Sequence, residues 1–258
     1  MKFTHLTITF TVLVFLVYAS LIISLFYFFD ARHFLQALLS KRTLFAVKLS
    51  IFAATLATFL SLFLAIPAAY ALSRYRFFCS TFIDTVLELP MIISPVALGA
   101  LLLIFLNTPV GLSLQTKGVQ IAFTVSGVVL AQFVSTLGVA TRLLKAAMDE
   151  IPTIYEDAAK TLGASPLKAF ITVTLPLSKR GIMSAAILTW AKALGEFGAT
   201  VTVAGSMAMK TETLPIAIFM RLASADIEGA AVLVLILISA GLGILYGARA
   251  LTKRAMYM

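Results

Sequence analysis

Ionisable side chains are scarce in this sequence: 12% of its 258 residues are charged, whereas 61% are hydrophobic. A soluble domain of this length is about one quarter charged, because its surface must be solvated. The apolar side chains therefore exceed what a water-soluble core could bury. The composition excludes a soluble globular protein and indicates a chain whose solvent is largely the lipid bilayer.

Cysteine and histidine are almost absent. The single cysteine, Cys79, excludes an internal disulfide, and with only His5 and His33 beside it no Cys/His metal cluster can form. No histidine follows position 33 to act as a base, and no Gly-x-Ser-x-Gly nucleophile elbow occurs. These absences argue against an intramembrane protease or a metal-dependent enzyme, and we expect no metal and no cofactor in this chain.

A Walker-type glycine loop with its lysine is also missing, so any ATP-driven process requires a separate ATPase chain. The formal net charge is +9. The basic residues stand at the ends of apolar runs, without a continuous patch interleaved with aromatics. This placement suits loops and lipid headgroups rather than nucleic acid.

The long apolar runs predict an all-α membrane protein with about six transmembrane helices, forming one domain over residues 1–258. A spanning helix needs about 20 mostly apolar residues, and six segments meet this requirement. Their approximate bounds are Leu6–Phe29, Leu44–Leu72, Phe82–Leu106, Val119–Leu144, Ser178–Ala204 and Ile227–Ala248.

Six spans place both termini on the same side of the membrane. With the N-terminus inside, the inner loops and ends hold twelve Lys and Arg residues, and the outer loops hold seven. The positive-inside rule therefore predicts a multi-pass protein of the cell membrane with both termini in the cytoplasm.

The connection over residues 149–176 carries helix signals. Thr153 and Glu156 have capping-box spacing, which predicts a short helix over Ile154–Leu162, and Gly163 can end it in the left-handed conformation. Ser165-Pro166 then starts a second helix, which Leu175-Pro176 should break before the fifth span.

The first of these helices has a smooth face at Ala158 and Ala159, with Glu156, Asp157 and Lys160 as polar contacts around it. Two roles remain open from the residues alone. The face can receive another protein, or the helix can pack on its own bundle at the membrane interface.

The spacing within this connection is specific. Glu156-Asp-Ala-Ala, three further residues and Gly163 are followed, nine residues later, by Val173-x-Leu175-Pro176. The pattern resembles the EAA loop of ATP-binding-cassette importer permeases, with Asp157 where the family has glutamate. The resemblance implies the type I importer permease fold, whose coupling helix sits in a cleft of a cytoplasmic ATPase. The coupling residues that it implies are Glu156, Asp157, Ala158, Ala159, Lys160, Gly163, Leu175 and Pro176.

The third apolar segment contains Pro90 and Pro95. Two prolines within six residues remove helix hydrogen bonds and predict a kink, either to shape packing or to line a pore. The stretch from Glu88 to Leu103 is similar to the third-helix signature of molybdate-type permeases.

The fifth segment places Lys192 and Glu196 near the middle of the membrane. Spaced four residues apart, they share a face and can form an ion pair, and Gly195 and Gly198 permit close helix approach or bending. The pair either fixes packing statically or belongs to a gate or translocation path. Trp190–Ala199 and Lys210–Ile218 look like the fifth helix and following loop of molybdate, tungstate and sulfate permeases, with Lys192 where those carry arginine.

Asp84 and Glu88 lie at the inner start of the third segment, where a helix N-terminus favours acidic groups. Arg142 and Lys145 end the fourth segment, where the positive-inside rule and the helix dipole account for them.

These resemblances imply a permease subunit of a molybdate or tungstate importer, with sulfate or thiosulfate as the alternative. The implied partners are a cytoplasmic ATPase dimer that carries ATP and Mg²⁺, a second permease copy, and an extracytoplasmic oxyanion-binding protein. A self-contained secondary transporter is the alternative of another class, and it would need no surface for an ATPase at Glu156–Gly163.

Overall fold

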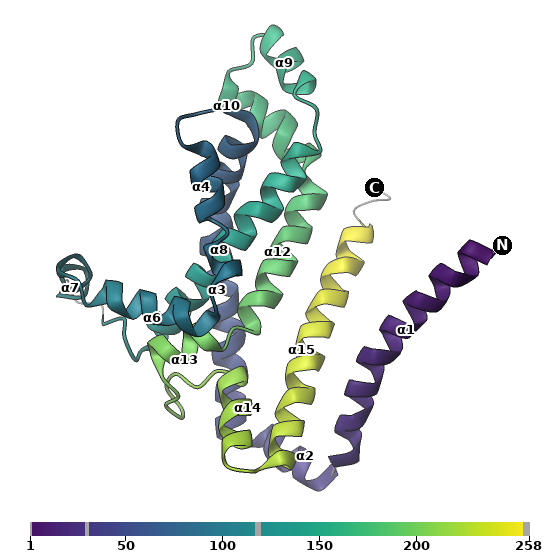
Figure 1. Cartoon of the computed structure of the whole chain (residues 1–258), viewed down its shortest axis with the longest axis vertical. Helices are drawn as coiled ribbons and strands as arrows, with labels where there is room; N and C mark the ends of the chain where they lie inside the picture. The colour runs from purple at the N-terminus through teal and green to yellow at the C-terminus, as the bar shows by residue number, and fades with distance from the viewer. Residues whose placement is uncertain (1, 29–30, 117–119, 255–258) are drawn as a thin grey trace.

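A computed structural model describes residues 2–28, 31–116 and 120–254, and the regular secondary structure of these residues is helical (Figure 1). The first half of the chain forms α1 (Lys2–Leu25), the 3₁₀ turn η1 (Phe26–Phe28), α2 (Ala31–Leu39), α3 (Lys41–Arg74), α4 (Ser80–Val86), α5 (Leu89–Ile92), α6 (Pro95–Leu106) and α7 (Pro109–Thr116). The second half forms α8 (Val125–Asp149), α9 (Ile154–Thr161), α10 (Pro166–Ala169), the π-helical turn η2 (Phe170–Thr174), α11 (Leu175–Leu177), α12 (Lys179–Leu194), α13 (Gly198–Ala204), α14 (Leu214–Ala223) and α15 (Ile227–Arg254).

Helices α3, α8 and α12 form the centre of the bundle (Figure 1). Small side chains let their backbones approach closely: Ala65 and Ala69 of α3 pack with Ala140 of α8 and Ala185 of α12, around Leu144. Membrane helices associate through such small residues, because the lipid supplies no hydrophobic driving force between them.

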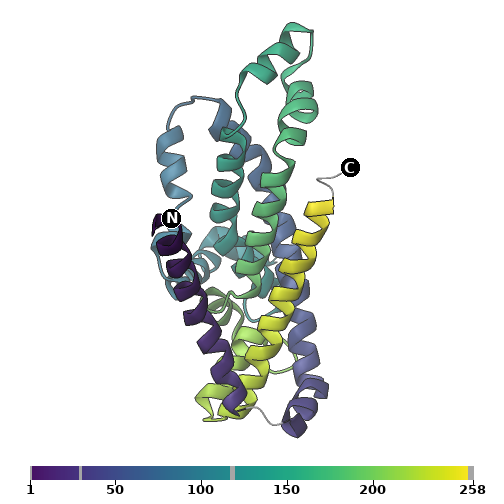
Figure 2. The same ribbon diagram turned by 90° about the vertical axis from the view of Figure 1, so that its right-hand side faces the viewer.

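Helix α1 stands at the side of the bundle, and the side chains described along it are mostly exposed (Figure 1). Helix α1 begins and α15 ends on the side of the molecule that carries α9, whereas α2 and α14 lie at the opposite end (Figure 1). Figure 2 shows α9 projecting beyond the ends of α3 and α8. We call the α9 end the inner end and the α2 end the outer end.

Four helices of the described chain are long and apolar enough to cross a membrane: 3–25 in α1, α3, α8, and 227–247 in α15. The pair α4–α5 and α6 passes the same test together but is bent by 115°. The fifth segment, predicted as continuous over Ser178–Ala204, is divided into α12 and α13. Residues 29 and 119, the predicted ends of the first and fourth segments, lie outside the described residues.

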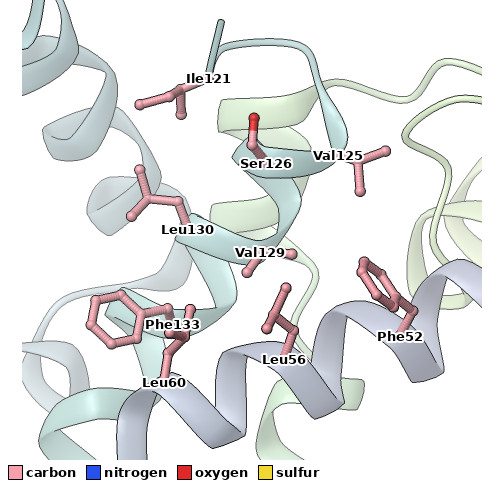
Figure 3. A pocket seen from close by; sticks show the side chains of 9 residues that line it. All are labelled: Phe52, Leu56, Leu60, Ile121, Val125, Ser126, Val129, Leu130 and Phe133. Atoms are coloured by element: carbon pink, nitrogen blue, oxygen red, sulfur yellow. The ribbon is translucent and has the colours of Figure 1, made fainter. Parts of the chain in front are cut away.

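An apolar groove of about 410 Å³ runs along the side of the bundle between α3 and the start of α8 (Figure 3). Phe52, Leu56 and Leu60 line it from α3, facing Val129 and Phe133 of α8. The Ser126 hydroxyl is the one polar side-chain group in this lining. Such walls suit hydrocarbon, and they offer too few donors to hold a hydrated dianion.

Candidate functional site

The loop at the inner end folds as two short helices at an angle, which confirms the prediction for residues 154–169. Helix α9 ends one residue before the predicted Leu162, and Gly163 follows it at φ 88°. The Ser165 hydroxyl accepts a hydrogen bond from the Lys168 N–H, and Pro166 occupies the first turn of α10.

Glu156 lies inside the protein, with 2% of its side chain exposed. Its carboxylate pairs with Arg74 of α3 at 2.7 Å and accepts hydrogen bonds from Tyr70 at 2.9 Å and Thr174 at 2.6 Å. The predicted capping box is therefore wrong, since Thr153 makes no side-chain cap. The expectation that Glu156 contributes to the outer face of α9 is wrong for the same reason. Arg74 is too far away in the sequence for any local pattern to reveal it.

Several donors converge on this carboxylate. Burial alone would raise the pKa of Glu156, but the hydrogen bonds from Thr174, Arg74 and Tyr70 outweigh burial and hold the pKa below its ordinary value. Arg74 also donates to the carbonyl oxygens of Met148 and Ile151, at 3.0 and 2.9 Å. One guanidinium thus joins the end of α3 to the end of α8 and to α9.

The rest of α9 faces outward. Asp157, Ala158 and Lys160 are exposed, and Asp157 pairs with Lys160 at 3.2 Å. Large apolar side chains lie beside them: Tyr155 is 54% exposed and Leu162 is 89% exposed. Exposed apolar groups next to a small-residue face favour contact with another protein.

Leu175 and Pro176 lie in α11, directly after Thr174, which holds Glu156. The predicted break before the fifth span lies two residues after Pro176: the chain stays helical through Leu177, and Ser178 separates this helix from α12. The π-helical turn η2 precedes the proline, with the Leu175 N–H bonded to the Phe170 carbonyl oxygen. A wider turn at this point accommodates a residue without an N–H donor.

The third segment is broken rather than merely kinked. Its break lies at Ile93-Ser94, where the Ser94 hydroxyl caps α6 by accepting from the Ala97 N–H. Pro95 starts α6, whereas Pro90 lies one turn before the break, close to Gly138 of α8. The two prolines therefore belong to different helices that diverge by 115°.

The fifth segment is broken at Gly195–Phe197. Glu196 lies beyond the end of α12 and accepts a hydrogen bond from the Ala199 N–H of α13 at 3.0 Å. The predicted ion pair between Lys192 and Glu196 is wrong: within the described part of the chain, Lys192 forms no ion pair. The break removes the shared helical face on which that prediction depended.

Both breaks open onto one pocket of about 490 Å³. Five of the six predicted path residues line it: Pro95, Lys192, Gly195, Glu196 and Gly198. The two broken segments touch at Gly198, where an added Cβ would lie 2.8 Å from the Cβ of Pro95 and 3.0 Å from the Val96 nitrogen. Pro90 is the one predicted path residue outside this lining.

Two charged contacts were missed by sequence reasoning. At the outer end, Arg42 forms a bidentate ion pair with Glu212, at 2.6 and 2.8 Å, and Glu212 is 1% exposed. At the inner end, Arg142 and Lys145 pair with Asp84 and Glu88, so helix dipoles alone do not account for these four groups. The partners lie 54 to 170 residues apart, beyond the reach of local spacing rules.

Residues 57–256 match the family model described as "Binding-protein-dependent transport system inner membrane component". The chain belongs to this family. A molybdenum transport system permease protein of Haemophilus influenzae is 37% identical over 177 residues, which cover 67% of this chain and 77% of the relative. A sulfate transport system permease protein of Salmonella typhimurium is 30% identical over 211 residues, covering 81% and 76%.

Solved transporters share the fold of this inner-membrane component. A chain of a bacterial alginate ABC transporter, solved in complex with an alginate pentasaccharide-bound periplasmic protein, superposes with a TM-score of 0.79 at 17% identity. The match covers 97% of this chain and 94% of that one. A chain of an inward-facing methionine ABC transporter gives a TM-score of 0.62 at 16% identity, covering 84% and 99%. The predicted type I importer permease fold is confirmed.

Proposed function

We propose that this permease carries molybdate or tungstate across the cell membrane, driven by a separate cytoplasmic ATPase dimer that docks on α9. The proposed substrate is supported by the 37% identity to molybdenum permeases of Haemophilus influenzae and Escherichia coli. Sulfate is the second candidate, because a sulfate permease is 30% identical over a longer stretch.

The exposed face of α9 supports the docking of the ATPase. It combines the exposed Ala158 and the half-buried Ala159 with the charges of Asp157 and Lys160 and the apolar side chain of Leu162. Gly163 lets the chain turn directly after α9, because its φ of 88° is the left-handed conformation that favours glycine. Leu175 and Pro176, the remaining coupling residues, directly follow Thr174, and we assign them the support of the α9 anchor.

The pocket between the two breaks is the proposed translocation path or gate. It places the Lys192 ammonium, free of an ionic partner among the described residues, beside the broken ends of α6 and α13. A cation here favours a dianion, and broken helices move at lower cost than continuous ones.

The assembly that follows has two permease copies around one path and an extracytoplasmic binding protein at the outer end. We propose two identical copies. Both termini lie in the cytoplasm in this arrangement, because α1 begins and α15 ends on the α9 side (Figure 1). The excess of basic residues in the inner loops favours the same orientation.

Reconstitution tests this proposal. The chain is placed in liposomes with its ATPase, and binding protein loaded with molybdate, tungstate or sulfate is added outside. We expect molybdate- or tungstate-loaded protein to stimulate ATP hydrolysis and uptake. Stimulation by the sulfate-loaded form alone would show that the substrate is sulfate and not molybdate or tungstate. Anion transport without any ATPase would overturn the proposal.

A further inference from the structure

Charged and polar side chains form a continuous chain of contacts at the inner end, which we call the inner polar chain. It begins at Glu156 on α9 and passes through Arg74 to Ser73, whose hydroxyl accepts from the Arg74 guanidinium at 3.0 Å. The same Ser73 hydroxyl donates to the carboxylate of Asp149 at the end of α8. The hydrogen bond that Ser73 donates joins α3 to α8, and the one that it accepts links it to its neighbour Arg74 on α3.

The inner polar chain continues along α8 to α4. Asp149 pairs with Lys145 at 3.6 Å, and Lys145 pairs with Asp84 of α4 at 3.5 Å. Arg142 lies one turn further along α8 and bridges the two carboxylates of the broken segment, Asp84 at 3.1 Å and Glu88 at 2.8 Å. Glu88 immediately precedes α5, the short helix that ends at the 115° break before α6.

The two ends of the inner polar chain differ in strength. At α9, Arg74 and Glu156 are 6% and 2% exposed, and breaking such a buried pair leaves an uncompensated charge. At α4, Arg142, Asp84 and Glu88 are 38%, 23% and 35% exposed, and pairs at such exposure are individually weak. The contacts of the inner polar chain at α9 are therefore expected to persist, whereas its ion pairs at α4 can break more easily.

The segment at the α4 end of the inner polar chain has few other attachments. No side chain of α4 or α5 is buried. Backbone contact with α8 occurs at Gly138, where an added Cβ would lie 2.1 Å from the Leu87 carbonyl oxygen. With so little apolar burial, the ion pairs to Arg142 and Lys145 carry a large part of what holds α4 in place.

We propose that Arg74, Ser73, Asp149, Lys145 and Arg142 are positioning residues, which transmit movement of α9 to α4 and so to the broken segment beside the path. This inference rests on the proposed function of α9 as the ATPase contact. Asp84 on α4 and Glu88 immediately before α5 are the receiving groups. Release of their pairs with α8 lets α4 and α5 swing about Ile93-Ser94 while α9 keeps its hold on α3.

The first arm of the test measures the position of α4 without ATPase or substrate. Spin labels are attached to the native Cys79, which precedes α4, and to a cysteine introduced by Glu150→Cys, an exposed position on the end of α8. We expect one narrow distance distribution, and a broad one after Asp84→Asn with Glu88→Gln. The matched control is Thr85→Val on the same helix, whose hydroxyl bonds only to the Thr81 carbonyl oxygen and whose loss should leave the distribution narrow. An unchanged distribution in the Asp84→Asn/Glu88→Gln variant would overturn the proposal.

The second arm measures whether the two ends act together in the reconstituted complex. Glu88→Gln and Glu156→Gln each remove a contact from the same inner polar chain. We therefore expect the double variant to take up substrate no more slowly than the slower single variant. Asp157→Asn, on the exposed face of α9, affects docking instead, so its effect should multiply with that of Glu88→Gln. If the reductions in uptake rate from Glu88→Gln and Glu156→Gln multiplied in the double variant, the result would contradict the proposed transmission. If the wild-type complex shows no ATP-driven uptake, the proposed function falls, and the first arm still decides whether the ion pairs hold α4.

Discussion

Arg74 and Glu156 form an ion pair of 2.7 Å between the inner end of α3 and the projecting helix α9, and both side chains are almost fully buried. Because Thr174 and Tyr70 also donate to the Glu156 carboxylate, α9 is attached to the bundle on one face. Its opposite face remains exposed. A helix held in this way can transfer a force from an outside partner to α3 without bending away from the bundle.

Arg74→Gln should loosen α9 while leaving the apolar packing of α3, α8 and α12 intact. The substitution leaves the Glu156 carboxylate buried without its cation, which costs about 3–5 kcal/mol. Hydrogen exchange of the α9 amides should therefore rise strongly, with little change in α8 before its last turn, where Arg74 binds the Met148 carbonyl oxygen. The control is Lys160→Gln, which removes an exposed ion pair within α9 that contributes about 0.3–0.5 kcal/mol. Equal exchange in the two variants would contradict the anchoring role of Arg74.

The attachment of α9 should depend on pH only below the ordinary pKa of a glutamate side chain. The pKa of Glu156 in the folded chain lies below its ordinary value of about 4.3. The stabilisation from this carboxylate is therefore complete above the ordinary pKa, and it is lost as the pH falls through the lower, folded-state pKa. Pepsin, which is active in acid, provides the measurement: cleavage near the exposed Tyr155 and Leu162 should accelerate only below the ordinary pKa. In Glu156→Gln the same cleavage should be fast throughout, and a wild-type midpoint above the ordinary pKa would refute the prediction.

Gly198 and Gly195 provide a matched pair of substitutions at the break of the fifth segment. An alanine at 198 would place its Cβ against Pro95 and the Val96 backbone, whereas at 195 the nearest atom is 3.6 Å away. Gly198→Ala should separate α13 from α6 and destabilise the chain by about 1–3 kcal/mol. Gly195→Ala should be close to neutral, because its φ of −84° suits any residue. Thermal unfolding in detergent compares the two, and equal melting temperatures would show that the contact at Gly198 is not tight.

Lys192 and Glu196 should behave as independent residues. Since no ion pair joins them, Lys192→Met should leave the stability of the chain near that of the wild type and slow ATP-driven uptake through the pocket. Glu196→Ala should instead cost about 0.5–2 kcal/mol of stability, because its carboxylate caps the first turn of α13. Comparing melting temperatures with uptake rates separates the two roles. If Lys192→Met lowered the stability as much as Glu196→Ala, the result would indicate an ion pair between the two residues and contradict this prediction.

The sequence predicts those features of this chain that depend on local spacing. Apolar runs locate α1, α3, α8 and α15, and the signals at Gly163, Ser165 and Pro166 locate the short inner helices. The prolines of the third segment predict its bend, although not that it diverges by 115°. The two glycines of the fifth segment permit bending. That Glu196 caps α13 could not be predicted, because it depends on where the helix breaks.

The inner attachment of α9 could not be predicted, for a physical reason. Glu156 at capping-box spacing reads as a surface residue, and its partner Arg74 lies 82 residues earlier at the end of another helix. The bridge from Arg142 to Asp84 and Glu88 is hidden in the same way, because each group has a sufficient local explanation in its helix dipole. Only tertiary packing shows that these charges meet.

Cross-linking tests the central claim, that the exposed face of α9 is where the ATPase docks. In a Cys79→Ser background, a photoreactive cross-linker is attached through Leu162→Cys at the end of α9, or through Leu222→Cys on α14 at the outer end; the two leucines are 89% and 55% exposed. In a complex whose ATP hydrolysis is stimulated by loaded binding protein, we predict that the ATPase is captured from position 162 and not from position 222. Equal capture from both positions, or stimulated hydrolysis without capture from position 162, would contradict the account.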